Sequence, residues 1–246
     1  MNFFKLCLSL FKENSLYYFL MIFLLNSLIA YSVVITIFKI VQQYFLSGRF
    51  KDKIFRLENI QLTNSLKNDF MIFNQALIVI DHRQPMAFTM GLRKPCIVLS
   101  SRLLEMLDHQ ELEAVIEHET FHQNNHDSIK IFILHLISHA LWFIPLTKWT
   151  YKNYIIISEL LADEFAVQRT GSEIGLGSAL LKLINSCFSE KPNPMLVYFS
   201  EAAVNYRLEQ LINPERKIPI RMETKSIVLS IHVLLLFMGM IVLAIT

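Results

Sequence analysis

Residues 108–127 read DHQELEAVIEHETFHQNNHD, and they govern how the surrounding chain folds. Asp108 and Glu111 have the spacing of a capping box, in which the side chain of each residue bonds the backbone N–H of the other, so a helix is predicted to begin here. Apolar residues at helical spacing then give that helix a buried face: Leu112, Val115 and Ile116.

The same helix carries the pattern H-E-x-x-H at His118, Glu119 and His122. Because residues four apart share one helix face, both imidazoles can reach one tetrahedral metal ion, and Glu119 lies beside it. Two histidines and a carboxylate suit zinc with one position left for water, whose proton Glu119 is placed to take. So short a pattern also arises by chance, and a third ligand is needed.

The best candidate for the third ligand is Glu159 in the segment SELLADEFA, residues 158–166. Asp163 follows one helical turn later and could orient a liganding histidine through its other ring nitrogen. The alternative is a solvated acidic helix face without a metal.

The composition indicates contact with lipid. The mean hydropathy is +0.41, and the chain has 19 Phe and only 18% charged residues. Two uncharged segments, Ser15–Phe38 and Ser226–Thr246, reach the roughly 20 apolar residues that a membrane-crossing helix needs. The first is too long for the apolar core of a signal peptide, so we expect it to remain as an anchor.

The charge pattern predicts an orientation. Lysine and arginine concentrate between the two spans, whereas only Lys5 and Lys12 precede the first span and no basic residue follows Lys225. The middle is therefore expected in the cytoplasm and both ends outside. The net charge of +2 gives no sign of a nucleic-acid partner. Three separated cysteines (Cys7, Cys96 and Cys187) predict neither a disulfide framework nor a Cys-based zinc site.

Short strands and several helices are predicted between the anchors. Two or three strands are expected within 76–81, 86–90 and 96–100. Helices are expected at 101–107, from 108, and at 154–169, 175–188 and 200–211. The predicted fold class is α+β: a mostly helical metallopeptidase domain with a small β-sheet, flanked by N- and C-terminal transmembrane helices. The predicted division is 1–46 for the anchor, 47–225 for the zinc metallopeptidase domain and 226–246 for the C-terminal helix.

The uncharged segment Ile131–Thr147 constrains this arrangement. If it crossed the membrane once, His122 and Glu159 would finish on opposite sides, with too few residues left to return. A shared zinc ion therefore requires this segment to dip into the membrane or to lie buried in the fold.

The other histidines of this region face elsewhere. On a continuous helix with about 100° per residue, His126, His135 and His139 cannot all point toward the face of His118. The polar run before Asp127 favours a helix end near His126, which we expect to be exposed or just behind the site. His135 and His139 form a second i, i+4 pair, open either to a second metal or, as we favour, to interhelical hydrogen bonding.

Three blocks carry a resemblance to a known family: AFTMGLRKPCIVLSSRLLEMLDHQELEAVIEHETFHQNNHD, then LWFIPLTKW, then SELLADEFA. The chain resembles the gluzincin-type membrane metallopeptidase domain of the BlaR/MecR β-lactam sensor-transducers over about residues 76–211, and more distantly the CAAX and HtpX-like membrane zinc proteases. The resemblance implies that His118, His122 and Glu159 bind zinc and that Glu119 is the general base. Asp163 matches the family's Asp, whereas Ala162 stands where the sensor-transducers usually have Cys.

The resemblance also implies two further elements. Ala87, Phe88 and Thr89 match an edge strand beside the zinc, which can pair with an extended substrate backbone. Arg207, in RLEQL, resembles a late element and would stabilise the oxyanion of the reaction. Without the resemblance, these residues also fit a core hairpin and a surface or interhelix arginine.

The function predicted from the sequence is that of a zinc endopeptidase of a bacterial-type cell membrane, multi-pass, with one Zn²⁺ per chain and a cytoplasmic catalytic domain. Its expected partners are a protein or peptide substrate, the bilayer and a sensor or regulator protein. Because the sequence reaches Thr246 within the last predicted span, we do not expect it to contain a penicillin-binding sensor domain. The alternatives are a quality-control protease of membrane proteins and a non-catalytic scaffold or receptor.

Overall fold

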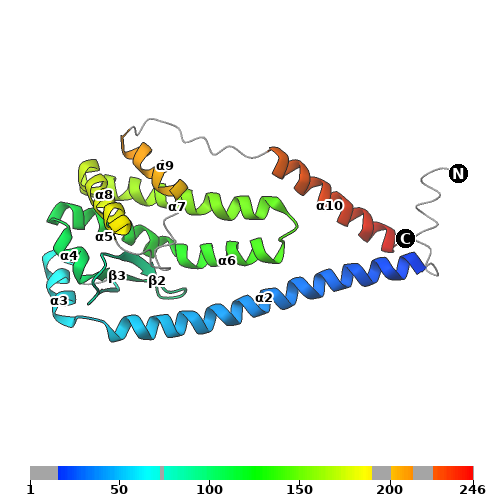
Figure 1. Cartoon of the computed structure of the whole chain (residues 1–246), viewed down its shortest axis with the longest axis horizontal. Helices are drawn as coiled ribbons and strands as arrows, with labels where there is room; N and C mark the ends of the chain where they lie inside the picture. The colour runs from blue at the N-terminus through cyan, green and yellow to red at the C-terminus, as the bar shows by residue number, and fades with distance from the viewer. Residues whose placement is uncertain (1–15, 73–74, 190–200, 213–223, 246) are drawn as a thin grey trace. The chain divides into compact units, whose positions relative to one another are not determined.

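The structure is a computed structural model, and it describes residues 16–72, 75–189, 201–212 and 224–245. The described residues fall into two compact units. Of the described residues, the first unit contains 16–44, 134–151 and 224–245. The second unit contains the described residues that fall within 45–133 and 152–212. The elements of the second unit carry all the residues discussed as a site (Figure 1).

A three-stranded sheet lies in the second unit, with β1 (Leu77–Ile80), β2 (Ala87–Met90) and β3 (Cys96–Ser100) in the order β1-β3-β2. β1 is parallel to β3, and β2 is antiparallel to it. The three strands confirm the prediction from the sequence. Gly91, after β2, has a φ of 105°, and a Cβ there would lie 2.6 Å from the Lys94 carbonyl oxygen, so the turn into β3 requires glycine.

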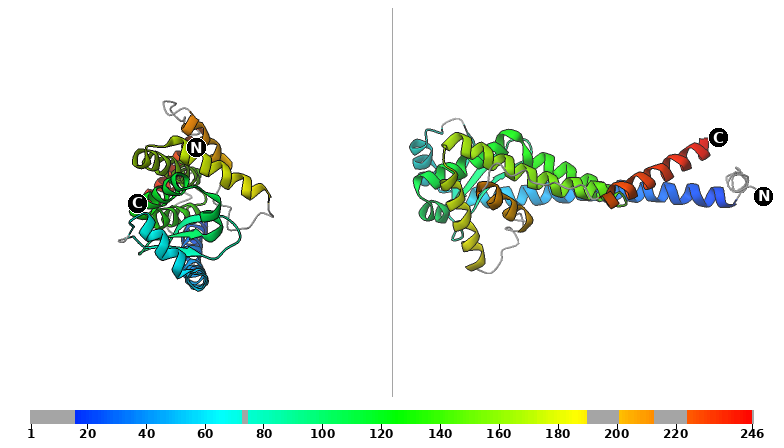
Figure 2. Two further views of the ribbon diagram at one scale, coloured as in Figure 1. Left: turned by 90° about the vertical axis from the view of Figure 1, so that its left-hand side faces the viewer. Right: turned by 90° about the horizontal axis from the view of Figure 1, so that it is seen from above.

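Side chains of the sheet alternate between two apolar cores. Leu77, Val79, Ile97 and Leu99 pack with residues of α4 (Ser101–Met106), α5 (His109–Asn125) and α8 (Glu173–Ser189). Ile78, Ile80 and Val98 pack with Ile54 at the end of α2 (Leu16–Arg56). α3 (Ile60–Asp69) contacts β1. Figure 2 shows the helices around the sheet from two further sides.

The predicted capping box is present at the start of α5. The Asp108 side chain accepts from the backbone N–H of Glu111, and the Glu111 side chain accepts from the N–H of Asp108. The helix ends at Asn125, because His126 adopts the left-handed conformation with a φ of 55°. His126 is exposed, as predicted.

The predicted apolar segment 131–147 is divided between two helices. α6 (Asp127–Ala140) ends before a turn, and α7 (Pro145–Thr170) begins at a proline, which is favoured at the first position of a helix. α6 and α7 are antiparallel, because the His135 and Tyr151 rings lie 5.4 Å apart and Tyr154 donates to Asp127 at 2.9 Å. The chain thus turns back after α6, which satisfies the requirement that Glu159 return toward His122.

The first unit contains the most apolar helices. Within the described residues, the one helix that meets the length and composition of a membrane span is Ile22–Arg56, in α2, and Thr224–Gly239 is a shorter apolar helix at the start of α10 (Thr224–Ile245). The predicted C-terminal span therefore stays a prediction. The Ser230 hydroxyl of α10 accepts from the backbone N–H of Leu146 at 3.1 Å, and the Phe143 and Phe237 rings lie 5.3 Å apart.

Candidate metal centre

Helix α5 presents the two histidines from a fixed position against the sheet. It contacts β2 and β3, and the Gln123 side-chain amide donates to the carbonyl oxygens of Ala76 and Pro95, both at 2.9 Å. These two residues come directly before β1 and β3. These two hydrogen bonds hold the end of α5 to the starts of β1 and β3. They therefore fix which face of α5 is turned toward the sheet.

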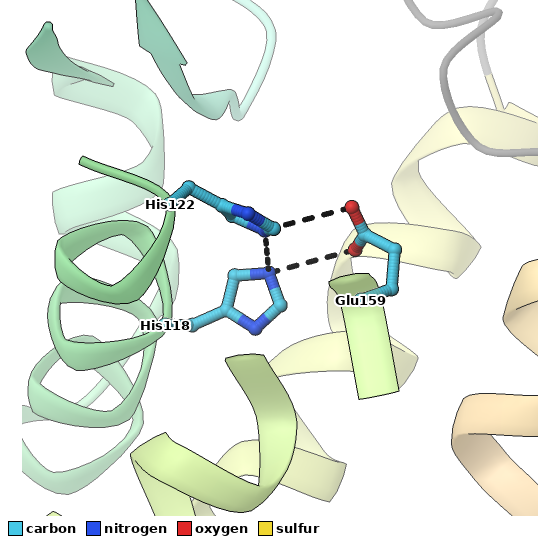
Figure 3. Close-up of side chains that lie close together, drawn as sticks. All are labelled: His118, His122 and Glu159. Carbon is cyan, nitrogen blue, oxygen red and sulfur yellow. Dashed lines mark hydrogen bonds and ion pairs between the residues drawn. The ribbon is translucent and has the colours of Figure 1, made fainter. Parts of the chain in front are cut away.

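His118 and His122 converge with Glu159 of α7, as Figure 3 shows. Their Nε2 atoms lie 3.2 Å apart. His118 Nε2 lies 3.5 Å from Oε2 of Glu159, and His122 Nε2 lies 3.5 Å from the other carboxylate oxygen, Oε1. This is the one group of three potential metal ligands in the described part of the chain, with all three ligand atoms within 4.8 Å of one another.

These separations fit a zinc ion. Ligand atoms at zinc's usual bond lengths of about 2.0–2.1 Å, arranged tetrahedrally, lie roughly 3.3 Å from each other. The two Nε2 atoms lie 3.2 Å apart, close to that value, and the Glu159 carboxylate faces both of them with one oxygen each, at 3.5 Å. Two imidazole nitrogens and a carboxylate oxygen are also a donor set typical of zinc with one position open.

A buried carboxylate lies behind each histidine. Nδ1 of His122 bonds Asp127 at 2.7 Å. Nδ1 of His118 lies 2.9 Å from Asp163, although the direction is too oblique for a well-formed hydrogen bond. A carboxylate beside Nδ1 favours the proton on that nitrogen, which leaves the Nε2 lone pair free for a metal.

Asp127 is itself held from two sides. Its Oδ1 accepts from the Tyr154 hydroxyl at 2.9 Å and from the Asn125 side-chain amide at 2.6 Å. The Asp127 side chain is only 2% exposed. Burial and the Asp127 carboxylate raise the pKa of Tyr154 above its usual value, so its hydroxyl stays a donor.

Arg207 of α9 (Glu201–Ile212) joins the two carboxylates of α7. Its Nε and Nη2 donate to the two oxygens of Asp163 at 2.7 and 2.8 Å, and its Nη1 donates to Glu159 at 3.0 Å. The guanidinium is almost fully buried. Such a two-point pair fixes the orientation of the carboxylate as well as its charge.

The charges of this cluster shift the pKa values of its members. Burial and the Arg207 charge act to lower the pKa of His118, but the carboxylates of Asp163 and Glu159 outweigh them and raise it to about 9. Burial acts to raise the pKa of Glu159 and of Asp163, but Arg207 and His118 hold both well below their usual values. The site therefore keeps its carboxylates ionised and favours a cation between the histidines.

Glu119 lies next to this group and contacts the sheet. Its side chain is 7% exposed, and Oε2 accepts from the Thr89 hydroxyl of β2 at 2.8 Å. The same hydroxyl lies 3.0 Å from the backbone carbonyl oxygen of Glu119. The predicted edge strand Ala87–Thr89 thus lies beside the predicted general base.

The sequence predicts most of this cluster but not all of its contacts. It predicts neither Tyr154 nor a role for Asp127. The signal for Asp127 was the polar run before it, since a helix break there folds the next turn back toward His122. The ring of His139 bonds the carbonyl oxygen of His135, one turn back in its own helix, through Nδ1 at 2.9 Å.

Two of three comparisons with known proteins gave a match. The model of the family described as BlaR1 peptidase M56 matches residues 7–211. A search of curated proteins returned no significant match. Among solved structures, the chain is similar to the crystal structure of Ste24p from S. mikatae, with 18% sequence identity and a TM-score of 0.41. That alignment covers 85% of this chain and 61% of Ste24p, so the chain spans less than two thirds of that protein.

Proposed function

The chain belongs to the BlaR1 peptidase M56 family, and from that membership we propose that it is an integral-membrane zinc endopeptidase. The proposal assigns His118, His122 and Glu159 as the zinc ligands and Glu119 as the general base. The observation that carries it is the convergence of His118, His122 and Glu159, whose ligand atoms lie within 4.8 Å of one another, with Glu119 next to His118 on the same helix.

The protein supplies positioning and proton transfer in this proposal. When bound, zinc supplies a Lewis acid that polarises a carbonyl and lowers the pKa of water to about 7. Glu119 takes a proton from the attacking water, whose oxygen forms the new bond to the scissile carbonyl carbon. Glu119 then delivers that proton to the amine nitrogen as the C–N bond breaks. Asp163 and Asp127 hold the two imidazoles in one tautomer, and Arg207 holds Glu159 and Asp163.

Arg207 has one of two roles in the reaction. The family resemblance assigns it to the oxyanion, whereas here each of its three nitrogens donates one hydrogen bond to Glu159 or Asp163. We therefore favour a positioning role through Glu159, and the two roles differ in a measurable way given in the Discussion.

An extended protein segment is the substrate class that the edge strand favours. Ser100 donates its N–H to the Met86 carbonyl oxygen at 3.0 Å, so in the antiparallel ladder Ala87 and Thr89 direct their backbone groups away from β3. Those groups can pair with a substrate backbone and so hold its scissile bond beside the metal site.

The proposed orientation follows the charge pattern of the sequence. Residues 1–46 and 226–246 form the anchors, and residues 47–225 form a catalytic domain on the cytoplasmic side. The exposed apolar side chains along α2 support an anchor, as do those along the described start of α10. A regulator or peptide precursor in a signalling or processing pathway is the proposed substrate.

A proteomic comparison tests the activity. Cells that express the wild type are compared with cells that express Glu119→Gln, and peptide fragments that require Glu119 are expected. Purified Glu119→Gln should keep one zinc ion per chain, whereas His118→Ala and Glu159→Ala should lose it. Full cleavage by Glu119→Gln would refute the mechanism, and stoichiometric zinc in Glu159→Ala would refute the ligand set.

Cysteine labelling tests the orientation. Glu105 is exposed on α4, so Glu105→Cys is placed in a chain whose three native cysteines are replaced. A membrane-impermeant maleimide should label this residue only after the cells are permeabilised. Labelling of intact cells would place the catalytic domain outside and overturn the proposed topology.

A further inference from the structure

The Thr89 hydroxyl lies between two acceptor oxygens of one residue. Its Oγ1 is 2.8 Å from Glu119 Oε2 and 3.0 Å from the Glu119 backbone carbonyl oxygen. A hydroxyl has a single proton and can donate to only one of them at a time. Rotation about the Cβ–Oγ1 bond moves the proton from one acceptor to the other without moving either residue.

We propose that Thr89 is a positioning residue for Glu119. This inference rests on the proposed function, in which Glu119 is the general base. The Thr89 hydroxyl donates to the Glu119 carboxylate and fixes its orientation.

The surroundings make this hydrogen bond effective. Glu119 is only 7% exposed, and a bond to a charged group gains strength where water is excluded. The β2 backbone is fixed by its ladder with β3, and a threonine side chain has a restricted first torsion. The hydroxyl is thus held in place by the sheet rather than by the helix that carries Glu119.

Thr89 also links substrate position to the base. Its backbone groups face the open edge of β2, where the Ser128 hydroxyl now donates to the Thr89 carbonyl oxygen at 3.4 Å. A substrate strand that paired with this edge would bond the backbone of Thr89, the same residue that orients Glu119. One residue would then set the position of the base relative to the scissile bond.

Kinetics of three variants test the inference, with fluorescein-labelled casein as the probe and the full chain in detergent. Thr89→Val removes the hydroxyl at similar volume, Thr89→Ser keeps it, and Thr120→Val is the control. Thr120 neighbours Glu119, but its hydroxyl bonds the Ile116 carbonyl oxygen of its own helix at 2.7 Å. We expect kcat to fall about tenfold or more in Thr89→Val, below the roughly 10²- to 10⁴-fold effect of a general base.

Four results together support the role: KM is unchanged in Thr89→Val, kcat returns in Thr89→Ser, Thr120→Val retains kcat within about twofold, and all three bind one zinc ion. If the hydroxyl only tied β2 to α5, Thr89→Val would raise KM and lower the melting temperature with kcat unchanged, which would overturn the proposal. Equal kcat in Thr89→Val and the wild type would overturn it too.

Infrared spectroscopy of the EDTA-treated protein gives a second readout that needs no activity. The carboxylate band that disappears in Glu119→Gln should shift in Thr89→Val and return in Thr89→Ser. An unshifted band in Thr89→Val would overturn the proposal while leaving the proposed function intact. A shifted band in Thr89→Val, together with no Glu119-dependent fragment in the proteomic comparison, would overturn the proposed function and with it the catalytic role of Thr89.

Discussion

Arg207 and Asp163 form a buried two-point ion pair with donor–acceptor distances of 2.7 and 2.8 Å. The two residues are 44 positions apart in the sequence and lie on different helices. The third donor of Arg207 reaches Glu159 at 3.0 Å. The single positive charge of Arg207 is therefore shared by two carboxylates: that of Glu159, the third candidate ligand, and that of Asp163, behind His118. This relationship makes the arrangement of the metal site depend on α9, which contributes no ligand.

Arg207→Met should destabilise the protein and weaken zinc binding. It leaves the buried carboxylate of Asp163 and the partly buried one of Glu159 without their cation. Breaking a buried pair in this way costs about 3–5 kcal/mol. We expect a lower melting temperature in detergent and a lower zinc content after dialysis against a weak chelator. Arg207→Lys should recover only part of both, since an ammonium cannot reproduce the two-point pair.

The alternative role of Arg207 predicts a different pattern. If Arg207 stabilised the oxyanion, Arg207→Met would lower kcat while zinc content and melting temperature stayed at wild-type values. That outcome would contradict the positioning role. A double-mutant cycle with Asp163→Asn measures the coupling directly.

Asp127→Asn should reduce zinc affinity by about 10–100-fold, the usual effect of removing a carboxylate that orients a liganding histidine. Tyr154→Phe should have a smaller effect in the same direction, because it removes one of the two side-chain donors to Oδ1 of Asp127. Competition with a zinc indicator measures both.

The matched control for Asp127 is His126→Ala, since His126 is its exposed neighbour. This variant should bind zinc as the wild type does. Equal zinc affinity in Asp127→Asn and His126→Ala would show that the contact with His122 does not affect the metal.

Glu111 should contribute stability that depends on pH. Burial acts to raise its pKa, but hydrogen bonds from Lys182 and Ser178 outweigh it and lower the pKa below 4.5. A lowered folded-state pKa adds stability that is complete above the unfolded value and lost as pH falls through the folded one. Glu111→Gln keeps the capping-box pattern and should cost about 1–2 kcal/mol at pH 7.

The measurement for Glu111 is the free energy of unfolding in detergent between pH 7 and pH 3. The difference between the wild type and Glu111→Gln should be constant at neutral pH and shrink below about pH 4.5. A difference that grows as pH falls would mean that the pKa is shifted in the opposite direction.

Ser230→Ala should destabilise the first unit. Ser230 is 1% exposed and accepts from the backbone N–H of Leu146 at the start of α7. A buried N–H without an acceptor costs about 1–3 kcal/mol. The melting temperature in detergent, followed by tryptophan fluorescence, should fall in this variant and stay unchanged in Val228→Ala, which alters an exposed residue of the same helix.

The local elements were predictable because their signals are local. The capping box at Asp108 marks the start of α5 directly, and the β-branched runs bounded by Gly91 and Pro95 mark the strands. The metal cluster was also within reach, since His118 and His122 lie one turn apart on one helix. Glu159 needed a spacing argument and a family resemblance.

The remaining contacts depend on tertiary packing that no periodicity records. The turn that divides the apolar segment was not predicted, although Pro145 favours a helix start at that position. The contact of Tyr154 with Asp127 exists only because α7 returns along α6. The bonds of Arg207 require α9 to lie against α7, and nothing in the sequence around Arg207 specifies such a neighbour.

The place of Arg207 in the chain has a consequence for biosynthesis. A ribosome that has made the chain through Glu159 has supplied every candidate ligand but not the guanidinium that holds two of the carboxylates. A competent active site would therefore assemble only after α9 has been translated and has packed. The nascent peptidase would stay inactive toward other membrane proteins at its insertion site for most of its synthesis.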